Sequence, residues 1–255
     1  MLNESVVVMP SKNRPEMLAL SLEKIALTPE GQYLDVRIYL DHGGNLAETE
    51  YVRDTYLPTA EIFQAKEHIS VLSGCWNILQ SLKAGYETEA RLIYLVEEDV
   101  LVSKSFFSLH NRIHGTGTYF VTCGRRLGKF PTDFYSNPGT CYRRESIEKV
   151  LPHINDDYFR DPGGYLDKHF PTMAGMDGPL DDGLIRKVQR SVNGRVLCTD
   201  PATAFHQGFK YYGKLDPWVN RTGTIQERIQ RLRKILSEIK STDRYAQDFE
   251  PFREG

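Results

Sequence analysis

Three consecutive carboxylates, Glu97, Glu98 and Asp99, are the residues of this sequence best suited to chemistry. They follow residues 92–96, an apolar run that is typical of a strand buried on both faces. Neighbouring carboxylates repel one another and raise each other's pKa unless a cation lies beside them. Ligands of open α/β sheets bind at the carboxyl ends of the strands, and Mg²⁺ or Mn²⁺ takes oxygen ligands. The run predicts a divalent-metal and nucleotide-sugar site, the alternative being an acidic turn facing solvent.

A second pair of neighbouring acids, Asp181 and Asp182, lies at the start of a predicted helix over residues 179–188. A carboxylate suits a general base that takes a proton from a hydroxyl group. Acids in a first helical turn are also favoured by the helix dipole, so the pair has a purely structural explanation as well. The sequence leaves both interpretations open.

The N-terminal segment predicts a cradle for an anion or a nucleotide. Residues 5–9 form a short buried strand that Pro10 ends, and the polar residues 11–14 then lead to Pro15, which suits the first turn of a helix. Helix N-termini after such loops bind anions, and the guanidinium of Arg14 suits a base or a phosphate. A capped helix start with a solvated arginine is the alternative.

Two further strand ends carry candidate residues. Asp41 follows the predicted strand at residues 36–40, where it suits a base imide or ribose hydroxyls, or serves as a turn residue. His206 ends another predicted strand and begins residues 206–214, which combine glycine, basic and aromatic side chains and include Lys210. A lone histidine at a strand end is usually structural, but this composition is compatible with a loop that faces a phosphate.

The rest of the chain alternates apolar strands with helices, with helix N-caps expected at Ser73 and Ser103. Residues 156–178 hold helix breakers among aromatic residues and methionines, so we expect a lid or an acceptor loop there, or else a linker. A tail helix over residues 224–240 is expected to dock on the parent domain through its apolar stripe, rather than bind an acidic partner or a membrane. The other expected strands are residues 61–65, 118–123, 139–143, 195–198 and 203–205, and another helix is expected at 47–56.

Two weaker signals favour simple solvation. His110 and His114 lie four residues apart, a spacing that can hold a metal ion, but no third ligand is near in sequence and a solvated helix face is the favoured interpretation. Arg125, Arg126 and Lys129 form a small basic loop, for which solvation is again favoured.

The composition is that of a globular protein able to bury a sizeable core. The 255 residues are 40% hydrophobic and 26% charged, with a net charge of −2 that gives no bulk attraction to nucleic acid or anionic membranes. No apolar run approaches the roughly 20 residues that cross a bilayer. The first residues resemble no signal peptide, and the four cysteines are scattered, which favours a reducing compartment. A cytoplasmic enzyme is the expectation.

Taken together, these segments resemble the GT-A fold nucleotide-sugar glycosyltransferases, and most closely the N-acetylglucosaminyltransferase I type, with general family-2 features. The resemblance implies an α/β fold: a single Rossmann-like domain with a mixed, mostly parallel sheet flanked by helices, and a C-terminal helix. It implies a catalytic domain at residues 1–220, with a nucleotide-binding half (1–101) and an acceptor half (102–220), and a helical tail at 221–255. The segments that carry the resemblance are residues 9–15, 40–41, 97–100 running into 105–107, 180–182 and 205–208.

The resemblance assigns a metal site to the acidic run. Asp99 matches the residue that coordinates Mn²⁺ or Mg²⁺, and His206 matches one that completes the metal shell in some relatives. Glu97 and Glu98 match positions that face donor-sugar and ribose hydroxyls. The most similar relatives have Glu-Asp-Asp, so Glu98 is one methylene longer here.

The resemblance also assigns the base and the nucleotide contacts. Asp182 matches the catalytic base, with Asp181 beside it. One base without a covalent partner implies a single displacement with inversion. Asp41 matches the residue that reads uracil. The nucleotide-sugar contacts expected in all are Pro10, Ser11, Asn13, Arg14, Asp41, Glu97, Glu98 and Lys210.

The expected reaction moves a hexose or N-acetylhexosamine from a UDP-sugar to an acceptor hydroxyl on a glycan, a protein, a small molecule or hydroxymethylated phage DNA. Eukaryotic relatives carry a membrane anchor that this sequence lacks, which suggests a bacterial or viral setting. A non-catalytic nucleotide-sugar binding protein is one alternative. A sugar nucleotidyltransferase is another, but it needs a glycine-rich loop after the first strand, and residues 9–15 contain no glycine.

Overall fold

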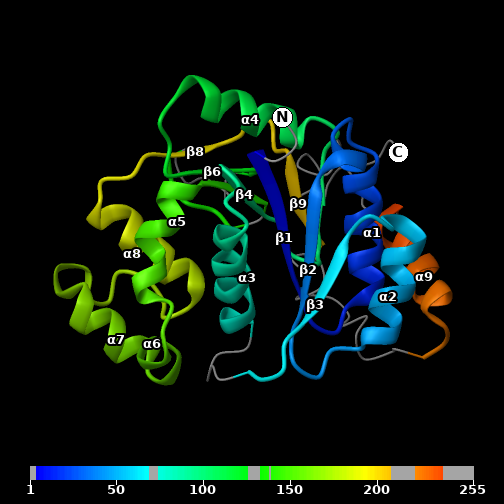
Figure 1. Ribbon diagram of the computed structural model, residues 1–255, viewed down its shortest axis with the longest axis horizontal. Helices are drawn as coiled ribbons and strands as arrows, with labels where there is room; N and C mark the ends of the chain where they lie inside the picture. Colours follow the sequence, from blue (N-terminus) through cyan, green and yellow to red (C-terminus); the bar gives the residue numbers. More distant parts are fainter. Residues whose placement is uncertain (1–3, 69–73, 126–132, 138, 208–221, 238–255) are drawn as a thin grey trace.

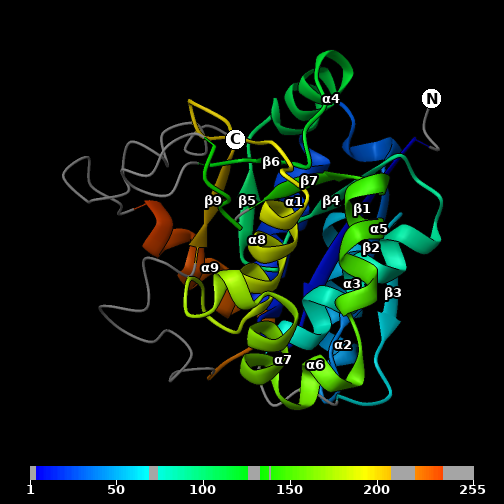
Figure 2. The same ribbon diagram turned by 90° about the vertical axis from the view of Figure 1, so that its left-hand side faces the viewer.

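A computed structural model describes residues 4–68, 74–125, 133–137, 139–207 and 222–237. Within them, the main sheet contains strands β1 (Ser5–Ser11), β2 (Asp35–Leu40), β3 (Glu61–Gln64), β4 (Leu92–Leu95), β6 (Val121–Cys123), β7 (Thr140–Arg143) and β8 (Val196–Cys198). Their order is β3-β2-β1-β4-β7-β6-β8, and Figures 1 and 2 together label these strands. Strand β7 is antiparallel to β4 and β6, and the other neighbours are parallel. This mixed, mostly parallel sheet confirms the predicted α/β fold.

Helices cover both faces of the sheet (Figures 1 and 2). One face carries α1 (Pro15–Ala26), α2 (Leu46–Tyr56) and α9 (Ile225–Ser237), and the other carries α3 (Cys75–Glu87), α5 (Arg144–Val150) and α8 (Asp181–Ser191). Because side chains alternate along a strand, Val7 and Met9 lie in the core under the first group of helices, while Val6 and Val8 lie in the second core. Central strands therefore have to be apolar on both faces.

A small second sheet pairs β5 (Val100–Val102) with β9 (Ala204–His206) in antiparallel fashion. Strand β5 begins directly after the acidic run, and the register places Val100 opposite His206. Helix α4 (Phe106–Thr116) follows β5 and begins after Ser105, two residues later than the N-cap expected at Ser103. The other expected N-cap, Ser73, lies outside the described residues, and Gly74 precedes α3.

The first strand runs two residues further than predicted and includes Pro10. Proline lacks an N–H group and is normally excluded from the middle of a sheet. It is tolerated here because the pairing of β1 with β4 ends at Val8 and Leu95, so that at Pro10 the register pairs β1 with β2 alone. The strand thereby carries Ser11 to the edge where the acidic run begins.

Residues 156–178 are more regular than the expected lid, acceptor loop or linker. They form α6 (Asp156–Arg160), α7 (Pro162–His169) and a 3-10 turn, η4 (Pro171–Met173). Asn155 and Asp161 cap the two helices by accepting backbone hydrogen bonds from Tyr158 and Gly164. Asp161 followed by a proline is a helix start, so these breakers mark helix boundaries rather than irregular chain.

The tail helix α9 docks on the parent domain, as predicted. Its stripe of Ile225, Ile229, Leu232 and Leu236 is buried in the core that α1 shares. Basic side chains of α9 pair with acids of that domain: Arg228 with Glu16 and Glu48, and Arg233 with Glu23. No helix in the described ranges has both the length and the apolar character that a membrane crossing requires.

Candidate functional site

The ends of several strands meet around the acidic run. After β4 ends, the backbone N–H of Val96 donates to Val8 and that of Glu98 donates to Pro10, so the run lies along the end of β1. Pairing of β5 with β9 places His206 beside it, and the N–H of Gln207 donates to the carbonyl of Asp99 over 2.7 Å. The carboxyl edge of the sheet thus gathers the predicted residues, as the topology of such sheets requires.

Glu98 binds the loop between β1 and α1. One carboxylate oxygen accepts from Ser11 Oγ (2.6 Å) and from the N–H of Lys12 (2.9 Å), and the other accepts from Arg14 Nε (2.5 Å). The residue is 1% exposed. A buried carboxylate held by three donors fixes the loop and keeps little accepting capacity for the donor-sugar contact inferred from the resemblance.

Arg14 bridges two acids of the run, because its Nε donates to Glu98 and its Nη1 donates to Asp99 Oδ2. Burial alone would lower the pKa of this guanidinium, but the charges of Glu98 and Asp99 outweigh it and raise the pKa above its usual value. The chain thus supplies a cation of its own to the acidic run, as the repulsion between the carboxylates demands.

Glu97, Asp99 and His206 form a second group, here called the acid cluster. One ligand atom from each lies within 4.8 Å of the others. Asp99 is buried, and its Oδ1 accepts no hydrogen bond from the described residues and lies 3.6 Å from His206 Nε2. Burial lowers the pKa of His206; Asp99 opposes this shift, whereas Arg14 and Arg125 add to it. A neutral imidazole is the form that binds metals.

The cluster fits a divalent cation. The pKa of Glu97 is raised well above its usual value by burial, by Asp99 and by Asp181, so negative charge is in excess here. Asn137 Nδ2 donates to Glu97 Oε1 over 3.2 Å. Two carboxylates and an imidazole suit Mn²⁺ or Mg²⁺, and one buried carboxylate oxygen accepts no hydrogen bond from the described part of the chain. The nitrogen ligand favours Mn²⁺.

The second acid pair lies at the start of α8, within electrostatic reach of Glu97. Asp181 is buried, and burial together with the charge of Asp182 raises its pKa to about 7. The side chain of Asp182 is 30% exposed and forms an ion pair with Arg186 Nη2 over 2.9 Å. The structure therefore brings the pair towards the acid cluster, with the two carboxylates in different surroundings.

Asp41 lies at the end of β2, next to Ser11, whose carbonyl accepts its N–H over 2.8 Å. Its buried carboxylate contacts Lys12 Nζ (3.0 Å) and His68 Nδ1 (2.8 Å). Sequence reasoning missed these two partners, although His68 follows β3 and the strand-end rule could have found it. Of the other nucleotide contacts expected, Pro10 ends β1, Asn13 lies in the following loop, and Lys210 is outside the described residues.

The two solvation interpretations are wrong for the residues that the structure describes. His110 and His114 are fully buried on α4, and their ring nitrogens lie 2.6 and 3.0 Å from Thr122 Oγ1 of β6. Arg125 is also buried and influences the pKa of His206, so it lies near the acid cluster. Arg126 and Lys129 are outside the described residues.

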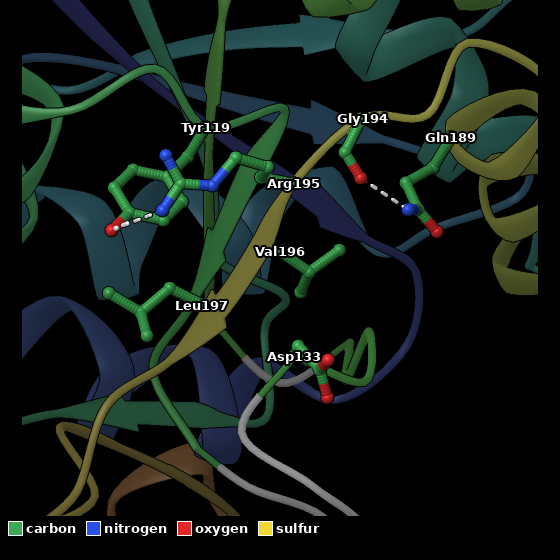
Figure 3. A pocket seen from close by; sticks show the side chains of 7 residues that line it. All are labelled: Tyr119, Asp133, Gln189, Gly194, Arg195, Val196 and Leu197. Carbon is green, nitrogen blue, oxygen red and sulfur yellow. Dashed lines mark hydrogen bonds between the residues drawn. The ribbon is translucent and has the colours of Figure 1, made fainter.

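A cavity of about 420 Å³ lies away from these groups, along the edge strand β8 (Figure 3). The predicted site residues are not among those that line it. Arg195 stacks over the ring of Tyr119 at 4.6 Å, and the Gln189 side chain donates to the carbonyl of Gly194. The lining residues are Tyr119, Asp133, Gln189, Gly194, Arg195, Val196 and Leu197.

No protein-family model matches the sequence, and no curated protein matches it significantly. Among solved structures, an active-site mutant of LgtC matches with a TM-score of 0.54 and 11% identity over 96% of this chain and 99% of that one. Mouse xyloside xylosyltransferase 1 matches with a TM-score of 0.51 and 8% identity over 76% and 85%. A cytidylyltransferase from Leptospira borgpetersenii reaches 0.49 with 9% identity over 91% and 93%, too weak for an argument. The chain has the fold of the GT-A glycosyltransferases.

Proposed function

We propose that this protein is a metal-dependent, inverting glycosyltransferase that moves a hexose or N-acetylhexosamine from a UDP-sugar to an acceptor hydroxyl. The observation that carries the proposal is the acid cluster of Glu97, Asp99 and His206 at the carboxyl edge of a GT-A sheet, within electrostatic reach of Asp181 at the start of α8. The resemblance to the N-acetylglucosaminyltransferase I type supports the donor class.

Different residues of the chain would bind different parts of the UDP-sugar. Asp99 and His206, with Glu97, would hold Mn²⁺ or Mg²⁺, which when bound neutralises charge on the leaving diphosphate as a Lewis acid. The loop that contains Arg14, together with Asp41, would enclose the nucleoside. The full set proposed to contact the nucleotide-sugar is Pro10, Ser11, Asn13, Arg14, Asp41, Glu97, Glu98 and Lys210.

Asp182 would accept the proton of the acceptor hydroxyl. As that oxygen forms its bond to the anomeric carbon, the bond from this carbon to the diphosphate breaks, and the single displacement inverts the configuration. Asp181 would stay beside the base, its charge limited by burial. Glycans, proteins, small molecules and hydroxymethylated DNA are the acceptors to screen. Among these acceptors DNA has the least support, because Arg228 and Arg233 of the tail helix pair with acids of the same chain.

One observation favours a second candidate, a non-catalytic nucleotide-sugar binding protein. Arg14 already compensates Glu98 and Asp99, so the acidic run is partly neutralised without a metal ion. The presence of both Asp99 and Asp182 favours the enzyme, because glycosyl transfer needs a metal ligand and a general base together.

The test measures UDP release from UDP-glucose, UDP-galactose and their N-acetylamino counterparts, with Mn²⁺ and then with EDTA. Metal-dependent release from one donor identifies it without knowledge of the acceptor and justifies an acceptor screen. In that assay Asp182→Asn should lower UDP release roughly 100- to 10,000-fold, the usual share of a general base, because water then takes the place of the acceptor hydroxyl, and UDP binding by calorimetry should survive. Transfer to any acceptor found in the screen should fall by the same factor. Asp156→Asn on α6 is the matched control.

Two results would overturn the proposal. Unchanged transfer by Asp182→Asn would remove the base assignment. If the unaltered protein neither releases nor binds UDP, the acid cluster is not part of a UDP-sugar site.

A further inference from the structure

Arg186 of α8 lies at the centre of an ion-pair network around Asp182. Its Nη2 pairs with Asp182 Oδ2 at 2.9 Å, and its Nη1 pairs with Asp177 Oδ1 at 3.2 Å. Asp177 belongs to the segment that enters α8, and its side chain is only 4% exposed. Arg190 pairs with the other oxygen of Asp177 at 2.6 Å. Arg186 is therefore held by a second acid besides Asp182.

Aromatic rings fix the guanidinium of Arg186 from another part of the chain. It lies over the rings of Phe134 and Tyr135, at 5.0 and 5.8 Å from their centroids. A cation over an aromatic face is attracted by the ring, and the side chain of Arg186 is only 16% exposed. The orientation of Arg186 is thus set by two acids, Asp177 and Asp182, and by two aromatic rings.

The same aromatic segment continues to the acid cluster. Tyr135 is buried, and its hydroxyl donates to Asn137 Oδ1 over 3.1 Å. Asn137 Nδ2 in turn donates to Glu97 Oε1 over 3.2 Å. Arg186 and Glu97 therefore contact two ends of one short stretch, residues 134–137, which ties the position of Asp182 to that of the acid cluster.

We propose that Arg186 is a positioning residue that orients the carboxylate of Asp182 for proton transfer, and that Asp177 fixes Arg186 for this task. The inference rests on the proposed function, because it assigns a role to Asp182. An exposed i,i+4 ion pair would orient a carboxylate poorly, since both side chains could rotate away. Here the arginine has a buried second partner and a ring face, which leave Asp182 one preferred direction.

The chain offers a matched control for this role. Arg186 and Arg190 both pair with Asp177. Among the ion pairs of the described residues, Arg186 also pairs with Asp182, whereas Arg190 does not. Arg186→Ala should lower the turnover number for UDP release roughly 100-fold, as misplacement of a catalytic group by about 1 Å does, with the donor KM changed less than about twofold. Arg190→Ala should change neither value more than about twofold.

Chemical rescue separates positioning from folding. Guanidinium ion added at millimolar concentration, far below denaturing levels, should restore UDP release several-fold in Arg186→Ala and leave Arg190→Ala unchanged. Arg186→Lys should fall between the two proteins, because an ammonium group cannot pair with Asp177 and Asp182 in the same fork geometry. Asp177→Asn should lower turnover less than Arg186→Ala, since Arg186 keeps Asp182 and the rings.

The outcomes distinguish this inference from the proposed function. If the unaltered protein releases UDP and Asp182→Asn abolishes release, but Arg186→Ala turns over normally, only the positioning role is wrong. Equal losses of turnover in Arg186→Ala and Arg190→Ala, without rescue by guanidinium, would also overturn the positioning role. If Arg186→Ala fails to fold, normal turnover of both Arg186→Lys and Asp177→Asn would overturn it. Absence of metal-dependent UDP release from the unaltered protein would remove both.

Discussion

Among the residues that the structure describes, two groups of metal-binding side chains can be compared, one partly buried and one fully buried, and the first of them has the character of a site. The acid cluster combines Glu97, Asp99 and His206. The other, here called the histidine cluster, consists of His110 and His114 around Thr122. Its two imidazoles are buried, and burial lowers the pKa of His110 to about 3 and that of His114 to about 4, so both rings are neutral at ordinary pH.

The two clusters differ in where the backbone places them. The acid cluster lies where β4 and β1 end, beside the small sheet in which β9 pairs with β5. Its ligand atoms therefore converge from the ends of strands. The histidine cluster faces the middle of β6 and is enclosed by rings, with Phe106 at 4.5 Å from His110. The clusters also differ in charge. The acid cluster has an excess of negative charge that a cation relieves, whereas the two neutral imidazoles of the histidine cluster have no charge to compensate. Ligand spacing becomes informative only together with a strand end and unbalanced charge.

The largest expected effect is on metal binding. Asp99→Asn should weaken Mn²⁺ binding by more than the roughly 10- to 100-fold that loss of an outer partner of a metal site costs, because it removes a charged ligand. His110→Gln and His114→Gln should leave Mn²⁺ affinity within about twofold. Electron paramagnetic resonance of free Mn²⁺ measures all three. Comparable losses in the histidine variants would erase the distinction between the clusters.

The next effect concerns the cation that the chain supplies. Arg14→Met should cost about 3 kcal/mol of unfolding free energy, because the buried carboxylates of Glu98 and Asp99 lose their cationic partner. Mn²⁺ should restore part of this loss, since it supplies positive charge to Asp99, the partner of Arg14 that also belongs to the acid cluster. Urea unfolding in EDTA and then in Mn²⁺ measures both quantities.

Arg37→Met is the control for Arg14, because Arg37 pairs with the half-exposed Asp35 and such pairs contribute at most about 1 kcal/mol. Equal losses in the two variants would mean that Arg14 does not serve the acidic run as a buried counterion.

The comparison also shows what sequence reasoning reaches. The α/β fold, the burial of β4 and the meeting of Asp41, Asp99 and His206 at one edge followed from apolar runs and from the rule that ligands bind at strand ends, although β5 and α5 were not expected. These are properties of local pattern and topology, which short stretches of sequence encode directly.

What escaped prediction depends on contacts between distant residues. Burial of His110 follows from Thr122 on a neighbouring strand, and the engagement of Glu98 follows from Arg14, 84 positions away. The helices at 156–169 are five and eight residues long, too short for a periodic pattern, and a contact such as that of Tyr158 with the carbonyl of Pro179 holds them in place. Such partners cannot be read from spacing, because many pairings satisfy the same pattern.

The smallest effect sharpens the contrast from the side of the histidine cluster. The folded-state pKa of His110 is depressed to about 3 by burial and by the neighbouring His114, against 6.5 in the unfolded chain. Below about pH 6.5 the unfolded chain therefore binds a proton that the folded chain does not bind, and stability falls by up to about 1.4 kcal/mol per pH unit until about pH 3. His110→Gln lacks this proton uptake. At pH 7.5 it should be about 1 kcal/mol less stable than the unaltered protein through its lost hydrogen bond to Thr122, and the difference should shrink or reverse near pH 5.

Urea unfolding between pH 4.5 and 7.5 measures this convergence, with the exposed His42→Gln as control. His114 is present in both proteins, so its own titration largely cancels from the difference. A stability difference that stays constant across this range would mean that His110 takes up its proton in the folded state. The histidine cluster would then be an open polar site like the acid cluster, and the distinction drawn from burial and charge would fail.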